Sequence, residues 1–471
     1  MRVRGEAFSP GAPARTRALV DSGSGLLEEL APIVERACAG AGLPAHRLIH
    51  ARRLSGGAIN QNFLLEVEGE GEGPTRWVMR RGLSQPIPGT HGRAAEFALF
   101  EWAQRQGLTV PRAIALIDSP EPTGASASVF EWRSGEADGR ALMAALRDSS
   151  HRAQLTRALG RELGRMHSEE AAVAASQSLL THIGERPIDG LAASMQSLRE
   201  SFALVRGPAA YLRFALDGVL EEAQTIGSPG GAATLCHNDF RLGNLMMDAS
   251  AGELTAVLDW EFAAWGDVMA DIGWLTAPCW RFGGTSPVAG FGELEDLVAG
   301  LEETLGERRV NALRARLQRE LPFWQRLAHL RWAIIAAQQG ERVVSKEPEA
   351  LELMITGAMA ASIVQPVVEH YLGGPAKEFA SGEVLQQECP EDWTSLDVWL
   401  SESAAHLKMH LASSLQGSAK YSALMAANAI RMARAQLRLA LRTPERIDSS
   451  GRAQVAEALL RDLAVWTFRG D

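Results

Sequence analysis

The sequence predicts an α+β protein in three parts: a β-rich first lobe, a larger α-rich lobe and a small all-α domain at the C-terminal end. Short alternating segments separated by glycine and proline occupy the chain up to about residue 135, which is typical of a small antiparallel sheet. From about residue 139 apolar residues recur at helical spacing. The expected divisions are a flexible leader at 1–24, the β-rich lobe at 25–135, the helical lobe at 136–372, a linker at 373–394 and the C-terminal domain at 395–471.

Length and composition exclude several classes of protein. The 471 residues exceed one ordinary domain, and 46% hydrophobic with 22% charged residues is typical of globular chains. A net charge of -10 argues against a nucleic-acid partner, because phosphate contacts need clustered Lys and Arg. No run approaches the roughly 18 apolar residues of a membrane span, so no membrane partner is expected.

The cysteines bear on the compartment. Cys38, Cys236, Cys279 and Cys389 lie far apart, and no pair has the short spacing of a zinc or redox motif. Reduced thiols and a cytoplasmic location are therefore expected.

The first lobe is expected to hold one helix inserted in a sheet. A helix is predicted at 26–41, a strand enters at Leu54, and a turn at 55–57 leads into a strand at 63–67. Further strands are predicted at 76–81, 110–117 and 127–132, and the inserted helix at 93–106. Alternation along 76–81 puts Trp77, Met79 and Arg81 on one face and Val78 and Arg80 on the other.

The remaining chain is predicted to be mostly helical. An amphipathic helix at 155–167 is followed by further helices to about residue 225, and helices resume from Val268. Between them, 234–247 and 254–260 read as two short β-rich pieces. Three helices are expected in the C-terminal domain, at 395–417, 419–441 and 449–468, the last with Ser449 or Ser450 as N-cap.

The polar residues that point to chemistry lie in these two β-rich pieces. Asp239, Asn244 and Asp259 stand among residues that favour burial. Phosphoryl transfer needs a carboxylate that orients the substrate hydroxyl and takes its proton, and oxygen ligands that hold Mg²⁺ on the phosphates. Asp239 fits the first role, and Asn244 and Asp259 fit the second. Any one of them alone is explained as a turn cap or a strand end, but their conjunction in this order favours the chemical interpretation.

Neighbouring residues are expected to support this set. His237 is predicted to hold the loop by a hydrogen bond, since a proton acceptor already stands two residues later. Arg241 has two open interpretations: it lies near the transferred phosphate, or it pairs with an acidic neighbour. Asp267 is expected at a helix start, and Asp271 is expected to brace the loop.

The run His237-Asn238-Asp239-Phe240-Arg241-Leu242-Gly243-Asn244-Leu245, followed by Leu258-Asp259-Trp260-Glu261 and by Gly266 to Trp274, resembles the aminoglycoside phosphotransferase family. In particular it is similar to the branch that includes the kinase-like part of some acyl-CoA dehydrogenase fusion proteins. The resemblance spans roughly 45–370 and implies a two-lobed protein-kinase-like fold with ATP and Mg²⁺ in the cleft. It does not identify the acceptor, because one fold serves many substrates. Residues from about 376 resemble a small helical domain of unknown function associated with such kinases.

The first lobe offers nucleotide-binding candidates at the matching positions. Ser55, Gly56 and Gly57 allow close backbone approach to phosphate, although a plain hairpin turn explains them equally well. Arg80 matches the phosphate-binding Lys of kinases, and Arg looks usual there in the branch named above. Glu96, on the following helix, matches the partner carboxylate of that cation. An ordinary surface ion pair is the alternative for Arg80 and Glu96.

The segment Phe130-Glu131-Trp132 falls where the hinge between the lobes is expected. Its backbone is predicted to meet the adenine edge, and its aromatic rings serve equally well as core.

These features predict an ATP-dependent small-molecule kinase whose acceptor is an alcohol group. The alternative is a nucleotide-binding pseudokinase that acts through partner binding by the C-terminal helices. Binding of a protein partner or self-association through these helices is also expected. A third interpretation is a phosphotransferase that uses another nucleotide. The presence of Asp239, Asn244 and Asp259 together favours the active enzyme. The row Arg431, Arg434, Arg438 and Arg442 reads either as a solvated helix face or as a docking face for an acidic partner.

Overall fold

The computed structural model describes residues 24–54, 60–69, 73–82, 89–117, 126–227, 231–341, 350–379, 394–415, 417–440 and 451–467. All of the predicted leader except Ser24 lies outside these residues. The chain divides into two compact units, one of Met1–Ser197 with Ile226–Gln325 and one of Leu198–Thr225 with Arg326–Asp471. The domain boundaries expected from the sequence stay predictions.

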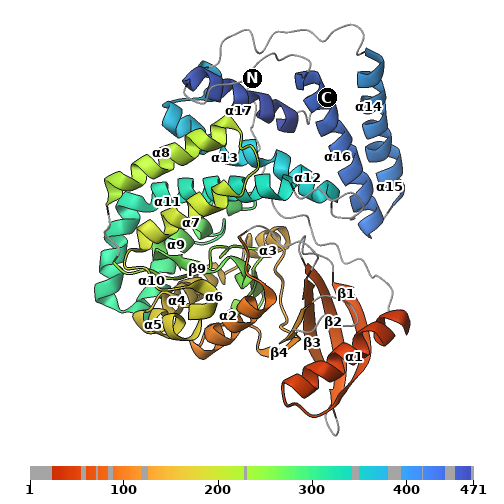
Figure 1. Cartoon of the computed structure of the whole chain (residues 1–471), viewed down its shortest axis with the longest axis vertical. Helices are drawn as coiled ribbons and strands as arrows, with labels where there is room; N and C mark the ends of the chain where they lie inside the picture. Colours follow the sequence, from red (N-terminus) through yellow and green to blue (C-terminus); the bar gives the residue numbers. More distant parts are fainter. Residues whose placement is uncertain are drawn as a thin grey trace. The chain divides into compact units, whose positions relative to one another are not determined.

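The first unit begins with a five-stranded antiparallel sheet in the order β1-β2-β3-β5-β4 (Figure 1). Its strands are β1 (His46–Leu54), β2 (Asn60–Gly69), β3 (Thr75–Gly82), β4 (Ala113–Ile117) and β5 (Ala127–Glu131). Helix α1 (Ser24–Gly40) precedes the sheet, and α2 (Arg93–Arg105) is inserted between β3 and β4. The predicted single helix inserted in an antiparallel sheet is thus present.

The alternation predicted for β3 separates a core face from an opposite face. Trp77 and Met79 are buried in a cluster that α1 closes with Leu30, Ile33 and Val34. Arg80 faces the other way and lies opposite Asn62 on β2 and Ser128 on β5. Burying the apolar stripe of α1 against one face therefore leaves Arg80 on the face that meets α2.

The rest of the first unit is helical and contains two short two-stranded antiparallel sheets. Strand β6 (Thr234–Cys236) pairs with β9 (Ala264–Gly266), and β7 (Leu245–Asp248) pairs with β8 (Glu253–Val257). The helices that follow α2 are α3 (Gly139–Leu146), α4 (Arg152–Met166), α5 (Glu169–Ser178), α6 (Leu180–Ile183), α7 (Gly190–Ala203), α9 (Val268–Thr276), α10 (Leu294–Leu305) and α11 (Glu307–Glu341), with 3₁₀ turns η1 (Trp260–Phe262) and η2 (Pro278–Trp280). Helices α7 and α11 each continue past the residue at which the unit ends.

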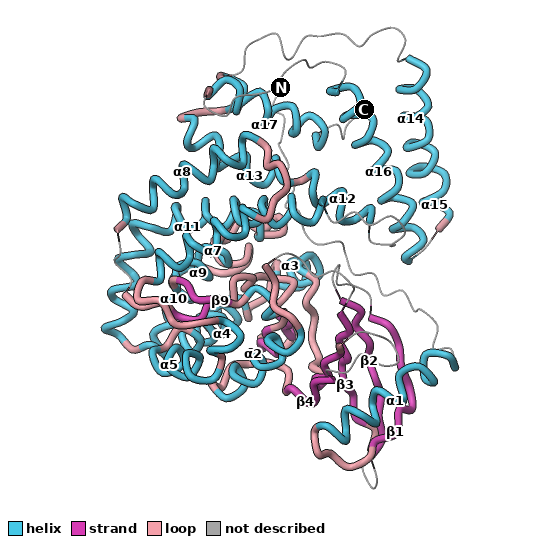
Figure 2. The backbone as a smooth tube through the Cα atoms, viewed as in Figure 1, coloured by secondary structure: helices cyan, strands magenta, loops and turns pink. Residues whose placement is uncertain are grey.

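Over its described residues the second unit consists of helices joined by loops, without a strand (Figure 2). Its helices are α8 (Ala210–Ile226), α12 (Ala350–Ala358), α13 (Ala360–Leu372), α14 (Thr394–His406), α15 (Ala412–Ser414), α16 (Gly417–Ala440) and α17 (Arg452–Thr467), with short turns η3 (Ala376–Glu378) and η5 (Leu407–Leu411). Helix α17 packs on α13 and α16, and Tyr211 of α8 donates a 2.7 Å hydrogen bond to Asp462 of α17. The proposed caps Ser449 and Ser450 lie outside the described residues.

This architecture confirms the predicted fold class: a small antiparallel lobe, a helix-rich lobe and further helices at the C-terminal end. Within the described residues, no helix combines the length and the apolar character that crossing a membrane requires.

Candidate active site

Two short two-stranded sheets bring the polar residues of the second lobe together. Leu245 pairs with Val257 across the β7–β8 hairpin, and the amide of Leu258 donates to the carbonyl of Asn244 over 2.8 Å. Asn244, just before β7, and Asp259, just after β8, are fifteen positions apart in the chain and therefore lie at the same end of one hairpin. The run from His237 to Gly243 forms the loop between β6 and β7.

Asp239 lies in this loop with its side chain 13% exposed. Its Oδ1 accepts from Arg241 Nε at 2.8 Å and from Trp274 Nε1 at 3.1 Å. Its Oδ2 accepts from Asn244 Nδ2 at 2.5 Å. Since Oδ1 already receives two donors, Oδ2 is the oxygen with capacity left for a further hydrogen bond.

The same contacts orient Asn244. Its amide nitrogen donates to both the backbone oxygen and Oδ2 of Asp239, so its amide oxygen points away from that carboxylate. Gly243 makes the tight loop feasible. It has a φ of +107°, and a Cβ there would lie 2.6 Å from Arg241 Nη1.

Arg241 pairs with an acidic neighbour, which was one of its two expected roles. Besides Asp239, it donates from Nη1 to the carbonyl of Leu242 at 3.0 Å. Its guanidinium carbon lies 4.2 Å from the ring centroid of Trp280. Cation–π contact with a buried tryptophan holds the guanidinium plane in place beside the carboxylate.

Arg80 links the first lobe to Asp259. Its Nη2 donates to Asp259 Oδ1 at 2.5 Å, and its Nη1 lies 2.7 Å from Glu96 Oε1. Glu96 is buried and also pairs with Arg93 at 2.6 Å. Burial opposes the charge of Arg80, yet Asp259 and Glu96 outweigh it and raise the pKa of its guanidinium above the ordinary value. A surface ion pair is therefore the wrong description of Arg80 and Glu96.

Glu261 is a third carboxyl group near this pair. Burial, together with the charges of Asp259 and Glu96, raises the pKa of Glu261 to about 8. Glu261 is thus largely protonated at neutral pH. The neutral form avoids a third negative charge beside the guanidinium groups of Arg80 and Arg93.

Asp271 holds the loop residues that precede Asp239. Asp271 accepts from the amides of His237 at 2.8 Å and Asn238 at 2.7 Å, and His167 Nε2 lies 3.1 Å from the same carboxylate. Burial opposes ionisation of Asp271, but the hydrogen bonds and the nearby imidazoles prevail and lower its pKa. Asp267 caps the start of α9 through the Met269 amide. Both aspartates take the structural positions that were expected.

His237 is buried and holds the loop rather than reaching the carboxylate of Asp239. Its Nε2 lies 2.9 Å from the carbonyl of Leu258, and its Nδ1 accepts the amide of Asp239 at 3.2 Å. These partners require the proton on Nε2. Burial lowers the pKa of His237, which keeps the ring neutral.

The structure does not test the nucleotide contacts predicted for the other candidates. Ser55, Gly56 and Gly57 lie outside the described residues. Phe130 is buried against the ring of Phe100 at a centroid distance of 4.6 Å, so it belongs to the core. The amides of Glu131 and Trp132 donate to the carbonyls of Arg112 and Arg76. The predicted adenine contact of this segment stays a prediction.

Sequence reasoning missed four residues of this site: Trp274, Arg93, Glu261 and His91. Arg93 precedes Glu96 by three residues on one helix, a spacing that indicates contact. Glu261 stood inside the motif that drew attention to Asp259. Trp274 ends the run from Gly266 that carried the family resemblance, but nothing local indicated its contact with Asp239, 35 residues away. For His91 the sequence carries no signal, because its partner Ala263 lies 172 residues away.

Solved structures with related folds include three phosphotransferases. The ethanolamine kinase of Plasmodium vivax is 14% identical with a TM-score of 0.45, over 67% of this chain and 81% of that one. A thermostable aminoglycoside phosphotransferase variant in complex with AMP-PNP and hygromycin B is 14% identical with a TM-score of 0.43, over 73% and 98%. The macrolide 2′-phosphotransferase of Brachybacterium faecium is 17% identical with a TM-score of 0.38, over 72% and 98%.

No curated protein is significantly similar to the chain in sequence. The model of the phosphotransferase enzyme family matches residues 50–309, which is more than half of the chain and includes every polar residue of the site described above. This chain therefore belongs to the phosphotransferase enzyme family.

Proposed function

We propose that the protein transfers the γ-phosphate of ATP to a hydroxyl group of a small molecule, with Asp239 as the base. The observation that carries the proposal is the grouping of Asp239, Asn244 and Asp259 at one end of the β7–β8 hairpin. Asp239 Oδ2 is held by Asn244, and Asp259 is held by Arg80 from the first lobe. A set that only capped turns would not need a cation from the other lobe.

The donor atoms at this place fit Mg²⁺. The amide nitrogen of Asn244 is used by Asp239, so its amide oxygen is the atom that could take a metal ion, and the Asn244 backbone is bonded to Leu258, the residue before Asp259. The side chain of Asp259 is 31% exposed. Oxygen ligands of this kind are those that Mg²⁺ prefers. Asn244 and Asp259 would therefore hold the ion, which supplies neutralisation of the charge on the phosphates.

The side chains have separate tasks in the transfer. Asp239 Oδ2 receives the hydrogen bond of the acceptor hydroxyl and takes its proton as the new P–O bond forms. The bond between the γ-phosphorus and its bridging oxygen breaks in the same step, which leaves ADP. Arg241 and Trp274 hold Oδ1 and so fix the direction of Oδ2. Arg80, steadied by Glu96, presents its donors to the ATP phosphates.

The proposal includes the family branch and leaves the acceptor open. The chain is proposed to belong with the kinase-like part of acyl-CoA dehydrogenase fusion proteins, and this resemblance is compatible both with an aminoglycoside acceptor and with another small molecule. Ser55, Gly56 and Gly57 are proposed to cover the phosphates, and the backbone of Phe130-Glu131-Trp132 to meet the adenine. The C-terminal helices are proposed as the surface for a protein partner or a second copy.

Turnover against a library of small hydroxyl compounds tests the proposal. ADP release with ATP and Mg²⁺ is measured for the wild type and for Asp239→Asn, with GTP in a parallel series. Acceptor-dependent release that falls in the variant supports the proposal. Tight binding of Mg²⁺-ATP without release for any acceptor or water would favour the pseudokinase, and release with GTP alone would exclude ATP as the donor.

A further inference from the structure

His91 joins the loop before α2 to the turn that follows Asp259. Its backbone amide donates to the carbonyl of Glu261 at 2.8 Å, and its ring Nε2 lies 2.6 Å from the carbonyl of Ala263. A carbonyl only accepts, so Nε2 carries the proton and donates. One residue of the first lobe thus makes two hydrogen bonds to the segment that directly follows Asp259.

The carbonyl of Phe262, which lies between these two in the chain, is held by the loop that carries Asp239. Asn238, next to Asp239 in the loop, donates from Nδ2 to the carbonyl of Phe262 at 3.1 Å. Three consecutive carbonyls, those of Glu261, Phe262 and Ala263, are therefore bonded alternately by His91 and by Asn238. The turn after Asp259 is a shared anchor for both lobes of the site.

The position of His91 in the chain connects this anchor to Arg80. His91 stands two residues before α2 begins at Arg93, and α2 carries Glu96, which pairs with Arg80. Asp259, which precedes the anchored turn, takes a second donor of the same guanidinium. Fixing His91 therefore fixes the distance between the two carboxylates that position Arg80.

From this geometry we infer that His91 is a positioning residue: its imidazole clasps the turn after Asp259 and holds α2, and with it the Arg80–Glu96 pair, ready for the nucleotide phosphates. The inference rests on the proposed function for its effect on ATP. The clasp itself is independent of that function.

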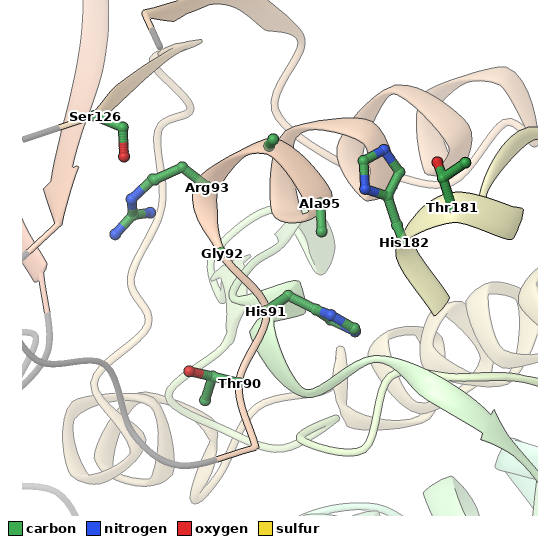
Figure 3. Close-up of a pocket in the computed structure, with 9 residues that line it drawn as sticks. Thr90, His91, Gly92, Arg93, Ala95, Ser126, Thr181 and His182 are labelled. Carbon is green, nitrogen blue, oxygen red and sulfur yellow. The ribbon is translucent and has the colours of Figure 1, made fainter. Parts of the chain in front are cut away.

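The chain offers a matched control. His182, on α6, lines the same hollow of about 480 Å³ at the start of α2 as His91 does (Figure 3). Within the described part of the chain, no hydrogen bond ties the His182 ring to the turn after Asp259. His91→Gln is the conservative variant, because a Gln amide nitrogen can reach the place of Nε2, whereas His91→Ala removes the donor.

Hydrogen–deuterium exchange and Mg²⁺-ATP titration test the inference on the full chain. In His91→Ala, exchange is expected to rise in both 89–96 and 260–266, and the Kd for Mg²⁺-ATP to rise roughly three- to tenfold, the effect of losing one hydrogen bond. His91→Gln should restore most of both, and His182→Ala should change neither. The melting temperatures of the two alanine variants are compared to detect general destabilisation.

Three results would overturn the inference. They are unchanged exchange in His91→Ala, equal effects of His91→Ala and His182→Ala, or raised exchange with an unchanged Kd. If the wild type binds no Mg²⁺-ATP at all, the proposed function fails, and the exchange of the two segments still decides whether the clasp exists.

Discussion

Replacing Asp239 by asparagine separates catalysis from nucleotide binding. The wild-type carboxylate accepts three side-chain hydrogen bonds, from Arg241, Trp274 and Asn244. An asparagine has one acceptor oxygen for these donors. If that oxygen stays with Arg241 and Trp274, its amide nitrogen faces the Nδ2 of Asn244, and two donors oppose each other.

The expected losses follow from these contacts. Turnover should fall by about 10²-fold or more, the usual range for losing a general base. The orphaned donors around position 239 should lower the free energy of unfolding by about 1–3 kcal/mol, because they are largely buried. The affinity for Mg²⁺-ATP should stay nearly unchanged, since Asp239 is not proposed to touch the nucleotide and its backbone oxygen still accepts from the amide nitrogen of Asn244, which keeps that side chain oriented.

The assay is single-turnover transfer from ATP to the true acceptor, or hydrolysis with water in its place, beside calorimetric titration with Mg²⁺-ATP. Asp248→Asn is the matched control, because Asp248 is a half-buried carboxylate at the other end of strand β7 that accepts hydrogen bonds from Ser250 and Ala251 and not from the site residues. His237→Ala should differ from both by lowering stability and turnover together. Unchanged turnover of Asp239→Asn, with chemistry limiting the rate, would refute the mechanism and favour the pseudokinase.

Three further perturbations address the metal, the phosphates and a buried proton. Asp259→Ala should abolish Mg²⁺-dependent ATP binding with the fold retained by circular dichroism, and wild-type affinity in calorimetry would contradict the ligand assignment. Arg80→Ala should weaken ATP binding strongly and Arg80→Lys less, since Lys keeps the charge but loses the fork that spans Glu96 and Asp259; equal ATP kinetics for Arg80→Ala and wild type would exclude the phosphate role. The raised pKa of Glu261, about 8 against an ordinary 4.5, means that the folded state binds the proton more tightly, so this group's contribution to stability declines as pH rises from about 4.5 to 8. Glu261→Gln should remove that decline, and urea unfolding at pH 5 and pH 8 in EDTA checks it: an equal pH dependence in both proteins would mean that Glu261 is ionised in the fold.

Local patterns in the sequence were sufficient for the elements and for much of the site. Alternation along β3 predicted that Arg80 faces away from Trp77 and Met79, and the structure places it so. Helical spacing put Glu96 on the helix that follows. The order of polar groups from Asp239 to Asp259 pointed to their chemistry. Each of these inferences needs only neighbours within a few residues, where backbone geometry dictates which side chains share a face.

What the sequence by itself determined is therefore the class of fold, the family and the identity of the polar set. Only the tertiary structure decided which side chains position these polar residues. Trp274 donates to Asp239, Arg80 is shared between Glu96 and Asp259, and His91 donates to the turn that follows Asp259. The protonated state of Glu261 was likewise undecided, because a pKa depends on burial and on charges brought near by folding. Contacts across 35 to 179 residues leave no periodic trace in the chain, since they arise from how whole elements pack and not from the local backbone.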